Sequence, residues 1–202
     1  QSLFIGDSRG ALYVTEYKKT EPEIKIKANP DQWGNREVTC VDLNTILNKE
    51  KIYFSLGNSI YQTDRACKNY AQIEFDIADN ISQFRVVDNI ALVASNNYLN
   101  KYEFGEDTKQ RGTYDNETHI TSICSCEFFG KGNPVSIIGS DDNKMKIING
   151  KDLLLTVPTS SATTAIDHYR SSINDVSENN FIFGSFNGSH GILSLDKNEG
   201  RI

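Results

Sequence analysis

The sequence is poor in the features that mark secreted, membrane-spanning and nucleic-acid-binding proteins. Its 202 residues include four cysteines, too few for a scaffold held together by disulfide bonds. No apolar run approaches the roughly 18 residues that a bilayer-spanning helix needs. Lysine and arginine number 21 against 27 aspartate and glutamate, so the chain has no electrostatic drive toward phosphate backbones or anionic lipid. The expectation is a soluble globular protein without nucleic-acid partners.

Residues with catalytic or metal-binding chemistry are also scarce. The three histidines, His119, His168 and His190, are far apart in the sequence. Asp167 precedes His168 as in part of a catalytic dyad, but residues 184–188 read GSFNG and not the G-x-S-x-G of a nucleophile elbow. The acidic turn at residues 140–143 lacks the alternating oxygens and the glycine of a calcium loop. The sequence therefore predicts no catalytic residue, no cofactor and no metal site.

The four cysteines are Cys40, Cys67, Cys124 and Cys126. The last two are two residues apart, so both point to the same face of a strand, but this is not the spacing of a zinc knuckle or of a redox C-x-x-C motif. We expect all four to be free structural thiols in a reducing compartment.

An internal repeat is the strongest positive signal. Each copy has a short apolar run, a small residue, a polar turn and then alternating apolar residues, which is typical of a β-hairpin. The copies lie near residues 3–17, 51–65, 90–104, 135–149 and 181–195. The small residue that ends the first run is Gly6, Ser55, Ala94, Gly139 or Gly184, with a mean spacing of 44.5 residues. This period matches the roughly 40 to 50 residues of a β-propeller blade, a four-stranded antiparallel sheet.

The segments between the hairpins supply the other strands of each blade. Innermost strands are expected at 38–43, 81–86, 120–124 and 164–169, and outermost strands at 23–27, 71–77, 110–114 and 153–157, which gives eighteen strands in all. Residues 42–50 could form one or two helical turns. No innermost strand precedes the first hairpin, and little chain follows the last. We therefore expect an all-β fold, a partial WD-repeat-like propeller of about 4.5 blades in one domain over residues 1–202, belonging to a larger ring of roughly six to eight blades.

Two further expectations concern single residues. Gly139 and Gly184 end the second strand of their blades, where a neighbouring blade packs, so a bulky side chain should overpack at either position. Trp33, Phe128 and Phe129 fall in loops and are candidate partner-binding residues, because aromatic side chains are enriched at protein interfaces. A cap over the core of a blade is the other reading of these three.

The repeats lack the Gly-His and Trp-Asp signatures of standard WD repeats, yet the sequences of the repeats and their order along the chain are similar to those of one propeller family. The stretches that carry the similarity are LFIGDSRGALYV, KIYFSLGNSIYQTDR, NPVSIIGSDDNKMKIINGKDLLLTVPT and FIFGSFNGSHGILSL. Over nearly its whole length the chain resembles the N-terminal β-propellers of the Bardet-Biedl syndrome protein 7 family, subunits of the BBSome. The paralogous protein 2 propellers are the alternative. Lys18–Arg36 and Gly105–Thr118 have no evident counterpart in the family.

The resemblance implies a non-enzymatic scaffold in a coat-like complex that traffics ciliary membrane proteins with intraflagellar transport. Its implied partners are other BBSome subunits, particularly other propellers, an Arf-like GTPase acting through the assembled complex, and membrane-protein cargo. The implied location is the cytoplasm and the cilium, including the basal body. Another ciliary or coat-complex propeller is one alternative. A propeller enzyme is the other, and polar residues converging on the central channel would indicate it.

Overall fold

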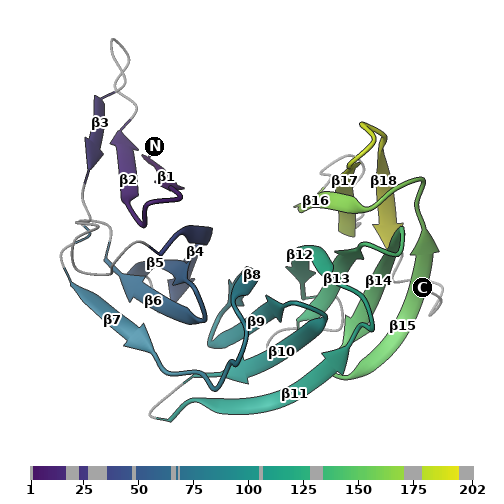
Figure 1. The fold of residues 1–202 in the computed structure, drawn as a ribbon, viewed down its shortest axis with the longest axis horizontal. Helices are drawn as coiled ribbons and strands as arrows, with labels where there is room; N and C mark the ends of the chain where they lie inside the picture. Colours follow the sequence, from purple (N-terminus) through teal and green to yellow (C-terminus); the bar gives the residue numbers. More distant parts are fainter. Residues whose placement is uncertain are drawn as a thin grey trace.

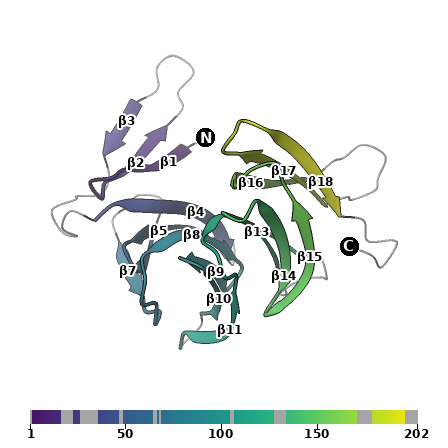
Figure 2. The same cartoon turned by 45° about the vertical axis from the view of Figure 1, so that its right-hand side comes forward.

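The computed structural model describes residues 2–16, 23–26, 36–46, 49–64, 67, 69–104, 107–127, 134–170 and 179–195. These residues form eighteen β-strands in five antiparallel sheets, so the expected all-β propeller fold is confirmed. Figures 1 and 2 show the sheets following one another around an arc, from the purple β1–β3 to the yellow β17–β18. None of the described segments is a helix long and apolar enough to cross a membrane.

We number the sheets as blades 1 to 5 in chain order. Blade 1 holds β1 (Ser2–Gly6), β2 (Leu12–Glu16) and β3 (Glu23–Ile26). Blade 2 holds β4 (Val38–Ile46), β5 (Lys49–Leu56), β6 (Ser59–Thr63) and β7 (Tyr70–Ile73). Blade 3 holds β8 (Ile81–Val87), β9 (Ile90–Ser95), β10 (Tyr98–Glu103) and β11 (Lys109–Asp115). Blade 4 holds β12 (Ile120–Cys126), β13 (Val135–Ser140), β14 (Lys144–Asn149) and β15 (Asp152–Pro158). Blade 5 holds β16 (Thr163–Arg170), β17 (Asn179–Ser185) and β18 (His190–Leu195).

Strands that follow one another in the chain are neighbours in each sheet, from innermost to outermost. The helical turns considered for residues 42–50 are wrong. Asp42 to Ile46 belong to β4 and pair with residues 49–53 of β5. Pairing along a whole strand outweighs the weak local helical propensity of this segment.

Among the described residues, the hydrophobic core is divided into four clusters, each between two adjacent blades. Tyr53 of blade 2 packs in one cluster with Phe84 of blade 3. In the same way Leu92 joins Ile123 across blades 3 and 4. Ile137 and Phe181 share the cluster of blades 4 and 5. A fourth cluster joins blades 1 and 2. Each sheet between two others therefore buries both of its faces.

The innermost strands of blades 2 to 5 all begin with an irregularity in pairing. The register shifts after the first residue, which leaves a hydroxyl residue in the bulge: Thr39, Ser82, Thr121 or Thr164. A bulge re-aims the strand and the side chain that it carries. The sequence reading did not find this pattern, because a Ser or Thr at the start of a strand looks unremarkable in one blade at a time.

Three of these four bulge hydroxyls reach the neighbouring blade, whereas that of Thr164 donates to the Gly184 carbonyl of its own blade. Thr39 Oγ1 donates to the carbonyl of Ile81, the first residue of β8, at 2.7 Å. Thr121 Oγ1 donates to the carbonyl of Thr163, the first residue of β16, at 2.6 Å. Ser82 Oγ lies 3.1 Å from the carbonyl of Ala94 in its own blade and 3.5 Å from that of Ile120 in the next.

The backbone makes a second link at the same place. Val38, Ile81 and Ile120 are the first residues of the innermost strands of blades 2, 3 and 4. The backbone N–H of each donates to a carbonyl in the hairpin turn of the preceding blade: Asp7 between β1 and β2, Gly57 between β5 and β6, and Asn96 between β9 and β10. The side of the molecule that carries these turns and the blade-to-blade connections is called the hairpin face below.

The outer faces of the two end blades expose positions that are buried elsewhere. Ile182 on β17 is 50% exposed, whereas Tyr53, Leu92 and Ile137 hold the same register position in blades 2 to 4 and are at most 2% exposed. At the other end Leu3 and Ile5 on β1 are 61% and 41% exposed. Within the described residues the arc thus has an exposed apolar sheet face at each end.

The two glycines expected to behave alike differ in their surroundings. A Cβ added at Gly139 would lie 2.5 Å from the Thr163 carbonyl oxygen and 2.5 Å from Ser122 Oγ. A Cβ added at Gly184 meets no atom within 4 Å. The overpacking expected at Gly184 is therefore wrong, because no described blade packs against that side of β17.

We predict that Gly139→Val lowers the free energy of unfolding by about 1 to 3 kcal/mol, because the backbone of blade 5 cannot move away cheaply. Gly184→Val is the matched control and should change it by less than about 0.5 kcal/mol. Urea denaturation of both variants measures the difference. Equal effects at the two positions would contradict the blade contact.

The exposed end faces predict self-association of residues 1–202 expressed alone, since unburied apolar sheet faces promote contacts between molecules. Sedimentation velocity over a concentration series measures it. A Leu3→Lys, Ile182→Lys double variant should raise the monomer fraction, and Leu153→Lys on β15 should not. A compact monomer for the unmodified chain at every concentration would contradict the prediction.

Candidate functional site

The three aromatic residues proposed as partner-binding, Trp33, Phe128 and Phe129, lie outside the described residues. The candidate surfaces are therefore built from the innermost strands, which line the inside of the arc, and from the turns of the hairpin face.

Four residues occupy one register position on the innermost strands. On each innermost strand, one residue pairs with the position that lies two residues before the small repeat residue of the neighbouring strand. These four residues are Asp42, Arg85, Cys124 and Asp167. They lie at the same level of the arc, one per blade, so polar groups do gather on the innermost strands. The sequence reading missed them because the register was not yet known.

Asp42 serves as a link between blades 2 and 3. Its Oδ2 accepts from the backbone N–H of Val86 on β8 at 2.7 Å, and its Oδ1 accepts from the N–H of Leu43 at 3.0 Å. Burial raises the pKa of Asp42, although the Val86 N–H and the Arg85 guanidinium favour the ionised form. Both carboxylate oxygens are committed to the backbone, so the group is placed to hold strands together.

Cys40 and Cys124, on the innermost strands of blades 2 and 4, are buried and form no disulfide bond, as expected from the sequence. Burial raises the pKa of Cys124 to about 12 and also raises the pKa of Cys40, whose Sγ lies 3.9 Å from Arg85 Nη1. A thiol must ionise to attack a substrate, so these cysteines lack nucleophilic character at neutral pH. Among the residues that the structure describes, no three His, Cys, Asp or Glu side chains form a group that could hold a metal ion.

The Asp167–His168 pair is not arranged as a dyad. The carboxylate of Asp167 accepts from the backbone N–H of His168 at 2.9 Å. The imidazole of His168 packs against Phe181, with ring centroids 5.0 Å apart. The histidine therefore contributes to the packing of β16 on β17.

A polar depression of about 500 Å³ opens on the hairpin face at blade 2. Its lining includes Arg36 and Glu37 before β4, Asn58 in the turn between β5 and β6, and Asn80 before β8. Asn58 Nδ2 donates to the carbonyl of Ile77 at 3.1 Å, which fixes one wall. Its mixture of one cation, one anion and amides suits a loop of a partner protein better than a small charged substrate.

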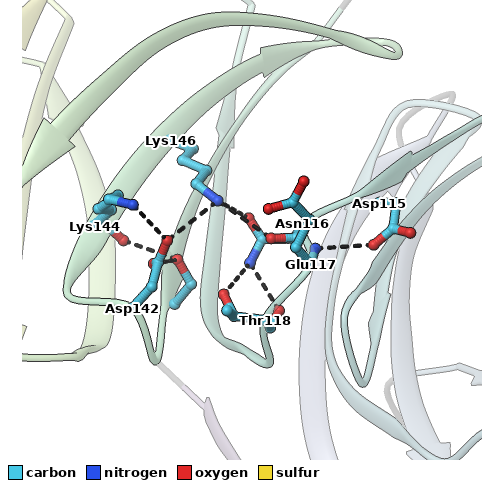
Figure 3. A network of polar contacts seen from close by, with 8 residues as sticks. Asp115, Asn116, Glu117, Thr118, Asp142, Lys144 and Lys146 are labelled. Atoms are coloured by element: carbon cyan, nitrogen blue, oxygen red, sulfur yellow. Dashed lines mark hydrogen bonds and ion pairs between the residues drawn. The ribbon is translucent and has the colours of Figure 1, made fainter.

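A buried lysine joins blades 3 and 4 near the hairpin face (Figure 3). Lys146 on β14 is 8% exposed and is the one charged residue among the buried described residues. Its Nζ donates to Asn116 Oδ1 at 2.7 Å and lies 3.5 Å from Asp142 Oδ2. Asn116 lies between blades 3 and 4, and its own amide donates to the carbonyl of Thr118 at 2.8 Å. The lysine is thus both paired and hydrogen-bonded, as a buried charge requires.

Asp142 completes this network. Burial acts to raise the pKa of Asp142, but the Ser140 hydroxyl and the ammonium groups of Lys144 and Lys146 outweigh it, and the pKa lies below the ordinary value. The Ser140 hydroxyl donates at 2.6 Å, and Lys144 Nζ is 3.1 Å away. The turn between β13 and β14 is therefore locked to its blade by charge.

The corresponding turn of blade 5 carries an aromatic side chain that sequence reasoning missed. Phe186 is 83% exposed, the highest value among the exposed large hydrophobic residues that the structure describes. Two residues after the small repeat residue, where blade 5 has Phe186, blades 1 to 4 have Ser8, Gly57, Asn96 and Asp141. Aligning the five turns position by position would have revealed this departure from the repeat.

Comparison with known proteins agrees with this architecture. A family model described as the BBS7 beta-propeller matches residues 1–202. No curated protein matches the chain. Among solved structures, the WD40 beta propeller domain of Doa1 superposes with a TM-score of 0.67 and 10% identity over 98% of this chain and 62% of that one. BBS1N, solved in complex with ARL6DN, gives a TM-score of 0.67 and 13% identity, with 98% and 61% covered.

A third similar structure is the computationally designed Ika4 protein, with a TM-score of 0.59 and 12% identity over 79% of this chain and 91% of that one. At these identities the structural matches establish the fold alone. The chain spans less than two thirds of the length of the Doa1 and BBS1N structures that it matches.

The lowered pKa of Asp142 predicts an acid-dependent loss of stability. A carboxylate with a lowered pKa in the folded state stabilises the fold above its unfolded-state value, ordinarily 3.8, and this contribution is lost as the pH falls through the folded-state value. At pH 7 we expect Asp142→Asn to lower the free energy of unfolding by about 1 to 3 kcal/mol. The difference from the unmodified chain should shrink below about pH 4.

Urea denaturation between pH 7 and pH 2.5 measures this difference, and the control is Asp141→Asn, whose side chain is exposed. A penalty for Asp142→Asn that stays constant over the whole range would show that the carboxylate charge is not what stabilises the turn.

Proposed function

Because the chain belongs to the BBS7 β-propeller family, we propose that it is a non-enzymatic scaffold module of the BBSome. In this role it contributes docking surfaces to a coat-like complex that moves ciliary membrane proteins with intraflagellar transport. Its place of action is the cytoplasm and the cilium, including the basal body. The observation that carries the proposal is the family match over residues 1–202.

The geometry supports a binding role over a catalytic one. The charged groups on the innermost strands are occupied within the fold: Asp42 bonds the backbone of the next blade, Asp167 bonds the backbone of its own strand, and Arg85 lies beside a protonated thiol. The hairpin face instead offers a polar depression and an exposed aromatic side chain. Rigid sheets that present varied loops are a common way to build interaction surfaces.

The proposed partners are other BBSome subunits, particularly those with propellers of their own. The BBS1 propeller fragment has been solved in complex with ARL6DN and has the same fold as this chain. We propose that an Arf-like GTPase reaches this subunit through the assembled complex, together with membrane-protein cargo.

Co-purification tests the proposal. The full-length polypeptide that carries residues 1–202 is tagged and expressed in ciliated cells, and the other BBSome subunits are expected in stoichiometric amounts in the eluate. The WD40 propeller of Doa1, which shares the fold, serves as the control under the same tag. Recovery of another ciliary or coat complex without BBSome subunits would overturn the assignment to the BBSome.

A further inference from the structure

The turn between β17 and β18 of blade 5 holds an exposed phenylalanine in a fixed backbone. The Phe186 N–H donates to the carbonyl of Ala162 at 2.9 Å, which ties the turn to the connection before β16. Ser185 and Ser189 close the turn through a 2.8 Å backbone hydrogen bond, and Gly188 takes a left-handed φ of 84° that glycine adopts freely. The backbone that carries the phenyl ring is therefore held in place before any partner binds.

Polar side chains brace the same turn. Asn187 Oδ1 accepts from the Ser189 N–H at 3.0 Å and from the Ser189 hydroxyl at 2.7 Å. The hydroxyls of Ser160 and Ser189 are 2.6 Å apart, so the turn is also joined to the neighbouring connection by side chains. An aromatic side chain on a braced turn loses little conformational entropy when it is buried, which favours its use as an anchor.

The exposure of Phe186 is a property of its position and not of the open end of the arc. Ser8 holds the same position in the blade 1 turn, which has the same length, and the Asp141 N–H of blade 4 makes the corresponding hydrogen bond to the preceding connection. Both residues are exposed even though another blade follows theirs. Aromatic side chains are enriched where proteins bind one another, so an exposed phenylalanine at this position is a candidate contact residue.

The surroundings of Phe186 differ in charge from the adjacent turns. Residues 158–162 and 185–189 read PTSSA and SFNGS and carry no charged side chain. The nearby blade 3 to blade 4 connection and the turn of blade 4 carry Asp115, Glu117, Asp141 and Asp142. An exposed aromatic side chain in surroundings without charge matches two features of the core of an interface, the enrichment of aromatic residues and the depletion of charged ones.

We propose that this patch, residues 158–162 and 185–189, is a docking site that inserts Phe186 into an apolar pocket of another BBSome subunit. This assignment rests on the proposed scaffold function and names the surface that carries part of it. The pocket is expected to be rimmed by hydrogen-bonding groups that match the serine, threonine and asparagine side chains. A strongly basic rim would fit the neighbouring acidic turns but not this patch.

Binding measurements with the full-length polypeptide test the proposal. The probe is the subcomplex of the remaining BBSome subunits, co-expressed and purified together, and biolayer interferometry gives Kd. Phe186→Ser should weaken binding about tenfold or more, while Phe186→Tyr should stay within about threefold. Tyr98→Ser, which removes another exposed aromatic side chain beside a turn of the hairpin face, is the matched control and should leave Kd unchanged.

A second variant reads the environment directly. In Phe186→Trp, the emission of the introduced indole, taken as the difference from the unmodified protein, should shift to shorter wavelength when the subcomplex binds. A solvent-exposed emission in the bound state would overturn the proposal even if Phe186→Ser were to unfold the turn.

The outcomes separate this proposal from the wider function. Tight binding of the unmodified protein with the same Kd for Phe186→Ser overturns the docking site and leaves the scaffold function standing. No binding of the unmodified protein overturns both. An effect of Phe186→Ser on self-association alone, seen in sedimentation, would assign the patch to a second copy of the chain and overturn the proposal as stated.

Discussion

Every blade of this protein is a thin sheet with two apolar faces, and neither face can be buried by the blade's own strands. The four core clusters all lie between blades, so the contact between neighbours takes the place of a central hydrophobic core. Fully burying one large apolar side chain contributes roughly 1.5 to 3 kcal/mol. The contrast between Ile137, fully buried, and Ile182, half exposed at the same register position, measures how much of this depends on the neighbour.

Apolar contact alone does not fix how far one blade slides past the next, and polar links at the innermost strands supply that constraint. A bulge turns a hydroxyl such as Thr39 or Thr121 toward the next blade, where it meets the first carbonyl of the innermost strand. Asp42 does the same with a backbone N–H further along. Hydrogen bonds are directional and short, so each pair of blades has one alignment in which they are all made. The buried Lys146 adds a charged version of this link between blades 3 and 4.

The sequence predicted whatever is local to one blade. The hairpin pattern and its period located the second and third strands of each blade. Short turns connect these strands, and the alternation of apolar and polar residues is visible along consecutive positions. The sequence could not distinguish Gly139 from Gly184, since the difference is whether the backbone of another blade stands 2.5 Å away. It gave no reason to bury Lys146, whose acceptors Asn116 and Asp142 come from the connection before blade 4 and from a turn. The shared register of Asp42, Arg85, Cys124 and Asp167 also required the strand pairing to be known.

The difference between strand positions packed between blades and turn positions exposed to solvent explains which residues can vary to suit different binding partners. Strand positions are constrained from both sides by neighbouring blades, so a change such as a side chain at Gly139 disturbs two sheets at once. The tips of the hairpin-face turns are held by backbone hydrogen bonds and leave side chains such as those of Ser8, Asp141 and Phe186 in solvent, so the residues there can differ from blade to blade. A residue that costs nothing in the fold is open to selection by a partner. In a propeller used as a scaffold, specificity is therefore expected in the turns, where the repeat is least uniform, and the strands keep those turns at fixed spacing.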